Sequence, residues 1–543
     1  MLFNSYEFLF AFLPITLAVF HLLGRWSRIA SLNWLILASL VFYAWWQPVN
    51  VPIIGVSMLV NFAIASWLEA AAADPDAGRQ RSRSLVLAAG IVFNVAFLGY
   101  FKYTNFLLSV ANDVAGTDFV LRQIALPLGI SFITFQKIGF LIDVNSGRVR
   151  SFTLREYLLF VLFFPQLIAG PIVHYREMMP QFERATGRLD RATLAVGLTM
   201  IGIGLFKKVV LADGVAEFVT PAFVAASSGH VALVSAWTAA LGFTLQIYFD
   251  FSGYSDMAAG LACCVGVRLP LNFYSPLQAT SIIDFWSRWH VTLTRFLTAY
   301  LYNPMLLRMT RRRFARGLPG MSGRNTPVGA FVQLLALPTL LTMLVSGIWH
   351  GAGYVFALWG LLHGVYLVIN HAWRLGVARY WPDRKAYARL MTPAGFLLTF
   401  IAVVVAMVLF RSPDVTTAGS IYRGMLGFGG VELPRLFIDR LAAHGLHFAQ
   451  FTPAAGVSAL QFLQPLLWIS ALLLIALLLP NSIQLLAPHQ PVLDASQRPS
   501  NTGLARLRLQ WNPTLPWAVV IAAMVVAAVM RMGGPSEFLY WQF

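Results

Sequence analysis

Long stretches of apolar side chains dominate this sequence and decide what it can fold into. Residues 330 to 349, for example, contain no charged side chain. About 20 apolar residues in a helix are enough to cross the hydrocarbon core of a bilayer. Over the whole chain 58% of the residues are hydrophobic and 11% are charged, whereas soluble domains carry about 25% charged residues. The sequence therefore predicts a helical membrane protein that crosses the bilayer many times.

Apolar runs at intervals along the chain predict the individual membrane-spanning helices. They lie at about 6–23, 30–47, 51–69, 83–101, 193–212, 328–347, 354–373, 392–410, 460–480 and 516–531. Residues 126–146 and 157–174 are also apolar, but Pro165 and the pair Gly170–Pro171 would break a spanning helix in the second stretch. Broken helices occur in membranes where they line a cavity or are buried in protein. We therefore expect an all-α polytopic fold of about 11–13 helices, some broken or re-entrant, around a central cavity.

The distribution of charge predicts the orientation of these helices. The chain has 39 basic and 22 acidic residues and a net charge of +17. In a soluble protein this excess would suggest nucleic-acid binding, but here the basic residues gather in short loops, so we expect no nucleic acid. Basic loops stay in the cytoplasm. This rule places loops 24–29, 70–82, 302–325, 374–390 and 481–515 inside, and both termini and the segment 411–459 in the periplasm.

The chain shows no internal repeat, and we expect one transmembrane domain over residues 1–543. Within it we expect N-terminal helices in 1–240, a catalytic core in 241–375 and C-terminal helices in 376–543. The sequence contains no Walker loop, Rossmann fingerprint, Gly-x-Ser-x-Gly elbow, His-Glu-x-x-His motif or Cys/His cluster. Nucleotide-dependent and serine-hydrolase chemistry are therefore unsupported, and no metal is expected.

Residues 346–364, SGIWHGAGYVFALWGLLHG, place His350 and His363 in otherwise apolar or small surroundings. An ionisable group at such depth is costly to bury and usually marks a functional site. Imidazole can take a proton near neutral pH, and the flanking Gly351 and Gly353 would let a helix end and a substrate approach. These residues favour His350 as a catalytic base inside the membrane. The alternative is a polar residue that joins two helices.

Residues 241–300 are the least lipid-like part of the hydrophobic body. Asp250 and Asp256 flank a Ser-Gly-Tyr-Ser sequence that we expect to form a turn. From Asp284 onward, apolar positions recur at helical spacing, which predicts one amphipathic helix that lies in the interface or bends into the protein. His290 belongs to this helix, either as a functional group or as an interfacial, aromatic-like residue.

Four further charged residues lie within apolar runs. Helical spacing puts Lys137 and Asp143 within two turns on roughly one side, where an ion pair could be structural or functional. Lys207 and Lys208 come near the end of a predicted span, where long side chains can snorkel to the membrane surface.

His290 and His350 lie 60 residues apart, on either side of the basic segment 302–325. Acyl transfer to a hydroxyl needs few groups beyond such a pair. A base removes the hydroxyl proton as the oxygen attacks a thioester carbonyl, and a second polar group orients one of the oxygens. A dry site strengthens both effects.

Several motifs carry a resemblance to a known family. They are MLFNSYEFLFAFLPI, LPLGISFITFQKIGFLIDV, FPQLIAGPIVHYREMMPQF, YFDFSGYSDMAAGLACCVGVRLPLNFYSPL, DFWSRWHVTLTRFL and SGIWHGAGYVFALWGLLHG. Together they run through most of the chain, which resembles the membrane-bound O-acyltransferase superfamily. The likeness is to the bacterial branch that holds the membrane subunit of alginate O-acetylation and the D-alanine transfer protein of teichoic acids.

This resemblance implies that His350 is the central catalytic histidine and His290 the second polar position. It implies transfer of an acetyl group from a cytoplasmic thioester such as acetyl-CoA toward hydroxyls of an exported polysaccharide of the alginate type. It also implies the bacterial inner membrane, a periplasmic acetyltransferase partner and the polysaccharide synthesis and export machinery. Acetylation of cellulose or peptidoglycan, a transporter without chemistry, and a structural export subunit remain alternatives.

We expect the neighbours of the two histidines to contact donor or acceptor, namely Trp349, Asp284, Arg288 and Trp289. A coenzyme A thioester carries phosphate charges and needs a basic entrance on the cytoplasmic side. The nearest dense basic cluster in sequence is Arg308, Arg311, Arg312 and Arg313, so we expect the donor to enter past these residues.

Overall fold

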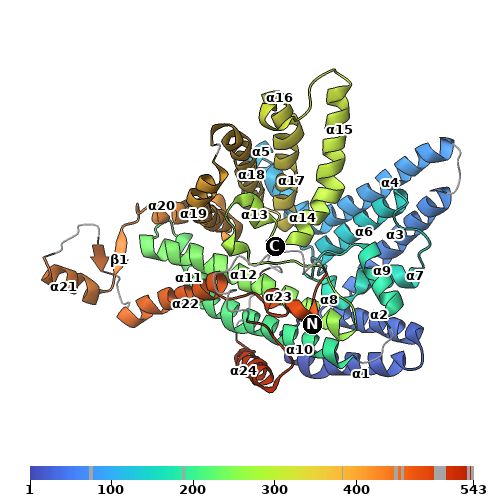
Figure 1. The fold of residues 1–543 in the computed structure, drawn as a ribbon, viewed down its shortest axis with the longest axis horizontal. Coiled ribbons are helices and arrows are strands. Elements are labelled where there is room, and N and C mark those ends of the chain that lie inside the picture. The colour runs from blue at the N-terminus through green and yellow to red at the C-terminus, as the bar shows by residue number, and fades with distance from the viewer. Residues whose placement is uncertain are drawn as a thin grey trace.

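Helices make up almost all of the protein (Figure 1). The structure is a computed structural model that describes residues 1–72, 77–185, 190–381, 383–445, 451–453, 458–493, 509–534 and 539. Its strands in these ranges form one short parallel pair, β1 (Val431–Leu433) and β2 (Phe451–Pro453), besides an isolated bridge between Pro270 and Leu493. The all-α prediction is confirmed. The C-terminal residues 535–543, whose orientation was predicted, lie outside the described ranges except for Leu539.

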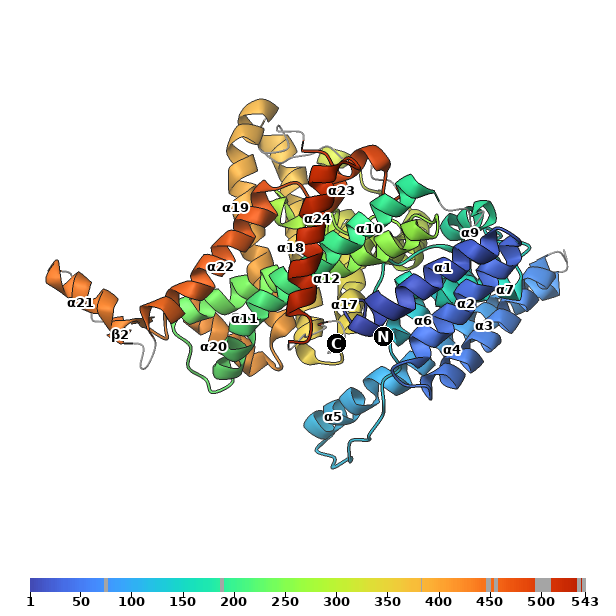
Figure 2. The same ribbon diagram turned by 90° about the horizontal axis from the view of Figure 1, so that it is seen from below.

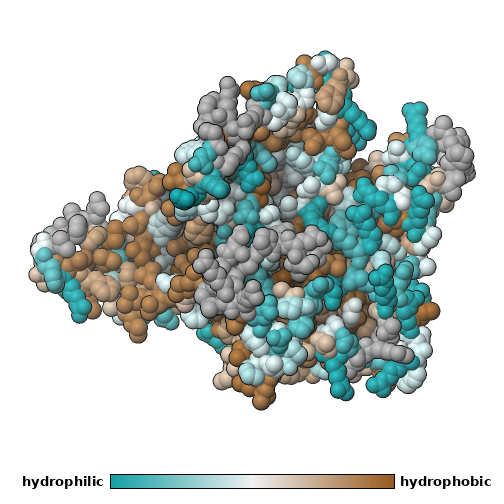
Figure 3. Space-filling view, in the orientation of Figure 1, coloured by the Kyte–Doolittle hydropathy of each residue, from teal (hydrophilic) through white to brown (hydrophobic). Residues whose placement is uncertain are grey.

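Seven helical stretches in the described ranges are long and apolar enough to cross a membrane. They are Asn50–Ala72, Gln80–Ala115, Arg191–Ala226, Val328–His350, Tyr354–Val377, Lys385–Arg411 and Ala459–Leu478. Shorter apolar helices cover Phe8–Gly24, Arg28–Ala44 and Leu515–Arg531. The polytopic prediction is thus confirmed. Apolar side chains gather on the surface over α11, α20 and α22, at the left of Figure 3.

Most of the N-terminal helices form one group at the right of Figure 1, whereas α5 lies apart from them, near the start of α18 (Tyr354–Tyr380). The N-terminal helices are η1 (Phe8–Phe12, a π-helical turn), α1 (Leu13–Gly24), α2 (Arg28–Ala44), α3 (Asn50–Ala72), α4 (Ala77–Leu98), η2 (Gly99–Tyr103), α5 (Thr104–Ala115), α6 (Ile130–Asn145), α7 (Leu154–Leu162), α8 (Phe164–Leu167) and α9 (Tyr175–Arg184). Rings of Phe8, Phe12, Phe42 and Phe164 pack against one another within 6.3 Å. This aromatic cluster ties η1 and α2 to the short helix α8.

The predicted break in 157–174 is confirmed. Helix α7 begins at a capping box made by Thr153 and Glu156 and ends at Phe163, after which α8 adds a single turn. A Cβ atom on Gly170 would lie 2.4 Å from the Cα atom of Gln166. The chain can therefore fold back tightly on α8 because glycine has no side chain.

The central helices are α10 (Arg191–Phe206), η3 (Lys207–Ala212), α11 (Asp213–Ala226) and α12 (Leu233–Cys264). Helix α12 is buried along most of its length, and it lies in the middle of the molecule in Figures 1 and 2. A Cβ atom on Gly204 of α10 would lie 2.5 Å from the carbonyl oxygen of Gly253 of α12, and one on Gly260 would lie 2.5 Å from that of Gly197. These glycines let the two backbones touch, as small residues do between membrane helices.

Buried ion pairs also join α12 to η3. The amine of Lys207 lies 2.7 Å from a carboxylate oxygen of Asp256, and the amine of Lys208 lies 2.7 Å from both Asp250 and Asp213. The prediction that Lys207 and Lys208 snorkel is therefore wrong, because carboxylates inside the protein hold both amines. The predicted turn between Asp250 and Asp256 is also wrong: these residues belong to α12, and helical geometry turns both carboxylates toward η3.

The second half of the chain completes the fold. Its elements are α13 (Ile282–Trp286), α14 (Val291–Leu297), η5 (Thr298–Tyr302), α15 (Asn303–Phe314), α16 (Val328–Phe331), η7 (Val332–Ala336), α17 (Leu337–His350), α18 (Tyr354–Tyr380), α19 (Arg384–Arg411), α20 (Val415–Met425), α21 (Arg435–Ala443), α22 (Ala459–Leu478), α23 (Ser482–Leu485) and α24 (Leu515–Arg531). Single 3₁₀ turns cover Pro276–Gln278, Gly323–Asn325 and Ala487–His489. The predicted basic loop 302–325 is largely helix α15, which projects from the body in Figure 1.

Lys137 and Asp143 do not meet, although both are buried. The amine of Lys137 donates a hydrogen bond to the hydroxyl of Ser57. Asp143 accepts one from Arg148 at 3.0 Å and another from the hydroxyl of Tyr300 at 2.9 Å. The ion pair considered from the sequence is thus replaced by three contacts, one of Lys137 and two of Asp143.

We expect Gly204→Ala to destabilise the protein, because the added methyl group would meet the carbonyl oxygen of Gly253. Overpacking of this kind costs about 1–3 kcal/mol. Gly55→Ala is the matched control, since a Cβ atom at this helical position in α3 meets nothing within 4 Å. The midpoint of thermal unfolding of purified protein in detergent should fall for the first variant and stay level or rise for the second. Equal midpoints would contradict the role of close α10–α12 packing.

Candidate active site

His350 is the last residue of α17, where the chain turns into α18. A Cβ atom on Gly347 would lie 2.2 Å from the carbonyl oxygen of Phe356, and one on Gly360 would lie 2.3 Å from that of Met343. A Cβ atom on Gly351 would meet the ring of Phe356 at 2.1 Å. Glycines at these places let α17 and α18 pack with their backbones in contact, which fixes the end of α17. The glycines after His350 thus allow the helix to end there, at the last residue of α17.

His290 lies in the connection between α13 and α14, so the prediction of one continuous amphipathic helix is wrong. Its backbone is left-handed, with φ +42° and ψ +51°, a conformation that is strained for a residue other than glycine. On either side of it, the backbone N–H of Tyr274 donates to the carbonyl of Arg288, and that of Val291 donates to the carbonyl of Asn272, each at 3.0 Å. These two bonds hold the segment inside the protein, and the His290 side chain is fully buried.

Asn272 fixes the orientation of the His290 ring. Its Oδ1 atom lies 3.0 Å from Nδ1 of His290 and accepts hydrogen bonds from the hydroxyl and the backbone N–H of Thr292, while its Nδ2 donates to Ser255 of α12 at 3.1 Å. Because a backbone N–H can only donate, the Asn272 atom that faces it is oxygen, and Nδ1 of His290 carries the proton. The lone pair of Nε2 is therefore the basic site of this ring, and Nε2 makes no hydrogen bond within the described ranges.

The two histidines lie together, with ring centroids 6.3 Å apart. Aromatic rings surround them: Trp349 lies 4.9 Å and Trp359 5.3 Å from the ring of His350, and Phe251 of α12 lies 4.7 Å from that of His290. The structure thus brings together two residues that are 60 positions apart in the sequence. Such a buried, polarisable enclosure strengthens electrostatic interactions with a reacting group.

His363 joins this group through Trp359, whose ring centroid lies 4.8 Å from its own. The indole N–H of Trp286 points to Nδ1 of His363 at 3.3 Å. Because an indole N–H can only donate, Nδ1 accepts and the proton of His363 sits on Nε2. His290 and His363 therefore have opposite tautomers: the Nε2 atom of His290 can accept a proton, and that of His363 can donate a hydrogen bond.

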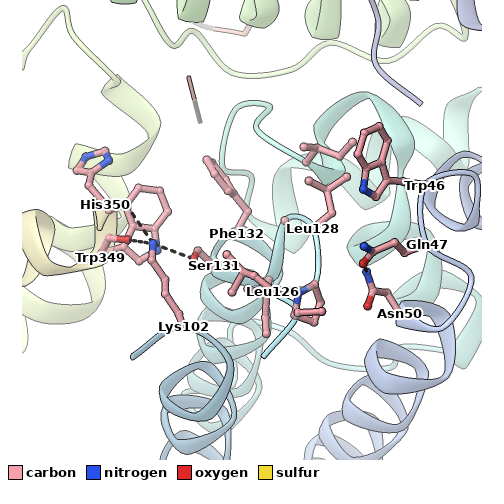
Figure 4. Close-up of a pocket in the computed structure, with 15 residues that line it drawn as sticks. Trp46, Gln47, Asn50, Lys102, Leu126, Leu128, Ser131, Phe132, Trp349 and His350 are labelled. Atoms are coloured by element: carbon pink, nitrogen blue, oxygen red, sulfur yellow. Dashed lines mark hydrogen bonds between the residues drawn. The ribbon is translucent and has the colours of Figure 1, made fainter. Parts of the chain in front are cut away.

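A cavity of about 210 Å³ reaches His350 (Figure 4). Its wall includes Trp349 and His350 on one side and Trp46, Gln47 and Asn50, from the turn between α2 and α3, on the other. The remaining lining residues come mainly from the segment 125–132 before and within α6. Of the two catalytic candidates, His350 lines this cavity, and His290 lies behind it.

A second cavity, of about 270 Å³, approaches α17 from its other end. Residues of α14, η5, α17 and α18 line it, among them Thr298, Tyr302, Thr342 and Ser346. Ser346 lies one helical turn before His350. Residues of α17 thus line both cavities, with His350 in the first and Ser346 in the second.

Lys102 is a site residue that the sequence reasoning missed. It lies in η2, and its amine donates to the backbone carbonyls of Trp349 at 2.6 Å and His350 at 3.1 Å, with the hydroxyl of Ser131 at 3.5 Å (Figure 4). A cation at the C-terminus of a helix stabilises its unpaired carbonyls. The sequence does show a lysine at the end of the predicted span 83–101. Lysines at such positions commonly extend to the membrane surface, so this position alone does not mark a site residue.

Asp284, Arg288 and Trp289 support the segment around His290 and do not line the cavity at His350. The carboxylate of Asp284 pairs with the guanidinium of Arg288 at 2.8 Å, and the ring of Trp289 packs on that of Phe273 at 5.1 Å. Trp349 does line the cavity. Of the predicted contacts with donor or acceptor, Trp349 is thus the one that the geometry brings to His350.

The predicted arginine cluster lies on α15 and is not uniform. Arg308, Arg311 and Arg312 are exposed. Arg313 is buried, and its guanidinium donates to the carbonyl of Pro319 at 2.6 Å and to the side chain of Gln333 at 2.8 Å. Arg313 therefore holds the chain after α15 against η7, and the other three present charge to the surroundings.

Within the described ranges, no group of three or more His, Cys, Asp or Glu side chains could hold a metal ion. The groups that converge at the end of α17 are imidazoles, an ammonium, amides and hydroxyls. This set can move a proton and can donate hydrogen bonds to a developing oxyanion.

Comparisons with known proteins agree with this chemistry. Residues 142–318 match the model of the membrane-bound O-acyltransferase family. The chain is 34% identical over 564 residues to a probable alginate O-acetylase, AlgI, of Pseudomonas aeruginosa, with all of both chains covered. It is 37% identical over 465 residues to a peptidoglycan O-acetyltransferase of Helicobacter pylori, which covers 80% of this chain and 82% of that one. It is 28% identical over 240 residues to a teichoic acid D-alanyltransferase of Bacillus subtilis, covering 44% and 57%.

Removal of the Lys102 charge should slow the reaction without weakening substrate binding. We expect Lys102→Met to lower kcat by roughly tenfold to a hundredfold, since small displacements of a catalytic group are costly, and Lys102→Arg to restore part of it. Lys137→Met is the control, because Lys137 is a buried lysine of the same helical group that contacts Ser57. The measurement is steady-state acetyl transfer, the activity for which two of these relatives are named. A changed KM with an unchanged kcat would show that Lys102 does not position His350.

Proposed function

The chain belongs to the membrane-bound O-acyltransferase family and is an O-acyltransferase, and we propose that it transfers an acetyl group from a cytoplasmic thioester toward hydroxyls of an exported polysaccharide. The observation that carries this proposal is the position of His350, at the end of a helix whose residues line two separate cavities. A donor and an acceptor could meet there without sharing one entrance.

The charge of the loops supports an assignment of the two cavities to opposite sides of the membrane. The basic segment that contains α15 is expected in the cytoplasm, and the turn between α2 and α3 in the periplasm. The cavity lined by Tyr302 and Ser346 then faces the donor side, and the cavity lined by Gln47 and His350 faces the acceptor side. We place the protein in the inner membrane of a bacterium with its N- and C-termini in the periplasm, as the charge of the loops predicts.

His350 acts as the general base in this proposal. It takes the proton of the acceptor hydroxyl while the hydroxyl oxygen attacks the thioester carbonyl, and the carbon–sulfur bond then breaks. The thiolate leaves with the proton from His350, which returns the imidazole to its neutral state. His290 orients the acyl or acceptor oxygen from behind, with its ring held by Asn272.

Acetyl-CoA is the donor that fits this scheme, with its charged portion outside and its uncharged arm in the second cavity. Thr298 in that cavity and its neighbour Ala299 are uncharged. The acceptor is the exported polymer or a hydroxyl on a periplasmic acetyltransferase that passes the group on, together with the synthesis and export machinery. An alginate-type exopolysaccharide is our first choice of polymer because the AlgI protein of P. aeruginosa matches along its whole length.

Peptidoglycan is the second candidate polymer, because the H. pylori relative is a peptidoglycan O-acetyltransferase.

We further propose that residues 1–543 work as one unit. Parts of the site come from distant stretches of the chain: Lys102 from the N-terminal helices, Asn272, His290 and His350 from the middle of the chain, and Phe410 of α19, which packs on the ring of His350 at 5.3 Å. Acetyl transfer from labelled acetyl-CoA to alginate or to peptidoglycan fragments, in vesicles from cells that express the chain, distinguishes the two polymers.

The roles of the two histidines predict a non-additive pattern of losses. We expect His350→Ala to lower acetyl transfer by ~10²–10⁴-fold, the contribution of a general base, and His290→Ala to lower it strongly as well. The double variant should be no worse than the more damaging single one, because groups that act as a unit are not additive. His444→Ala, at an exposed position after α21, should retain full activity.

Membrane insertion and thermal stability of each histidine variant serve as checks on folding. Near-normal turnover by a folded His350→Ala protein would make His350 a structural residue and would contradict the proposed mechanism. Multiplicative losses in the double variant would mean that the two histidines do not share one site.

The arginines of α15 should affect donor binding and not chemistry. We expect replacement of Arg308, Arg311 and Arg312 together by glutamine to raise the KM for acetyl-CoA, to leave kcat largely unchanged and to weaken the salt dependence of binding. Arg313→Gln is the contrasting variant, because its guanidinium holds Pro319 and Gln333, and its loss should lower thermal stability first. Donor affinity and the accessibility of the α15 segment are measured on the same preparation. Unchanged affinity with unchanged orientation would refute entry past α15.

A further inference from the structure

A groove between α18 and α19 has a volume of about 800 Å³, compared with about 270 Å³ for the cavity beside Ser346. Ile369 and Trp373 of α18 form one wall, and Tyr387 and Leu398 of α19 form the other. The residues before α13, including Ser281, close one end. Neither His290 nor His350 lines it, so the groove is separate from the cavity at the candidate active site.

The groove opens toward the surroundings of the membrane-spanning helices. Ile369 is 60%, Trp373 50% and Leu398 65% exposed, and all three lie in stretches apolar enough to cross a membrane. In a bilayer, such exposed apolar side chains contact the hydrocarbon of lipids. A hydrocarbon chain is therefore the chemistry that fits the apolar part of the groove.

Trp373, Arg374 and Tyr387 line the groove at the end where α18 leaves the membrane and α19 enters it. There the indole N–H of Trp373 donates to the hydroxyl of Tyr387 at 2.8 Å, and such amphipathic aromatic residues sit at the headgroup level of a bilayer. Residues 374–390 contain five basic side chains and one acidic side chain. The acidic one, Asp383, accepts hydrogen bonds from backbone N–H groups and caps α19. This end of the groove therefore favours a negatively charged headgroup.

Arg374 is the basic residue that lines the groove itself. Its Nη2 atom donates to the hydroxyl of Ser281 at 3.2 Å, which engages one part of a guanidinium with five N–H donors. The guanidinium geometry suits two hydrogen bonds to a phosphate. The carboxylate nearest in sequence to Ser281, that of Asp284, pairs with Arg288 instead.

We propose that this groove binds an anionic phospholipid, with one acyl chain between α18 and α19 and the phosphate on Arg374. The groove is connected directly to the candidate active site. Ser281 caps α13, and the backbone N–H of Ile283 donates to the side chain of Asn370, which also lines the groove. A lipid bound there stabilises the start of the segment that continues to Trp286 and His290, whatever reaction the protein performs.

Native mass spectrometry of the full-length protein, stripped of lipid in detergent and then supplied with phosphatidylglycerol or phosphatidylethanolamine, tests the proposal. The wild-type protein should retain phosphatidylglycerol more strongly, and Arg374→Gln should lower its apparent affinity about fivefold, the effect of one basic group near a membrane surface. Arg389→Gln is the matched control, because Arg389 is an exposed arginine of α19 that does not line the groove. Thr392→Trp, which places a large side chain at an exposed position in the groove, should weaken the binding of both lipids.

Thermal stability without added lipid confirms that each variant is folded, and phosphatidylglycerol should raise the unfolding midpoint of the wild type and of Arg389→Gln but not that of Arg374→Gln. Equal loss in the two arginine variants would mean diffuse attraction to a basic surface and would overturn the proposal. Unchanged binding by Thr392→Trp would also overturn it, because the acyl chain would then lie elsewhere. Displacement of the lipid by millimolar inorganic phosphate would identify the ligand as a free anion and not a lipid.

Discussion

The contact between α10 and α12 is the constraint on which the site depends. Glycines at 197, 204, 253 and 260 let the two backbones touch, and the carboxylates of Asp250 and Asp256 hold Lys208 and Lys207 across the same interface. A buried charge without a partner is strongly destabilising, so the four charges fix the rotation of α12. That rotation directs Ser255 toward Asn272 and places Phe251 against the ring of His290. The orientation of a catalytic candidate thus follows from the packing of two helices that do not carry it.

His350 depends on a second, independent set of contacts. Gly347 and Gly360 bring α17 and α18 together, and Lys102 of the N-terminal helices binds the carbonyls at the end of α17. The two histidines therefore meet because three separate packing contacts agree: α10 with α12, α17 with α18, and η2 with the end of α17. A change in any one of them would separate the rings without removing either imidazole.

The charges of the molecule are divided between its interior and its edges. Around the histidines the neighbours are mainly aromatic rings, amides and hydroxyls, which suits an uncharged acyl group and strengthens hydrogen bonds to a developing oxyanion. Exposed arginines lie on α15 and at the end of the α18–α19 groove. Charged parts of ligands can therefore be bound at the periphery while the uncharged parts reach inward.

The sequence by itself determined the fold class, the positions of most membrane helices and the break after α7, and it singled out His290 and His350 as candidate site residues, because hydropathy, proline and buried imidazoles are local signals. It could not determine which groups meet. The lysines expected to snorkel form ion pairs with Asp250 and Asp256, and Asp143 accepts a hydrogen bond from Tyr300 and does not pair with Lys137. The guanidinium of Arg313 binds the carbonyl of Pro319 in the loop after α15, and the amine of Lys102 binds the backbone carbonyl of His350. Each of these contacts joins residues whose distance depends on the rotation of whole helices. Periodicity shows which face of a helix is apolar, but only tertiary packing decides which polar group on another helix it meets.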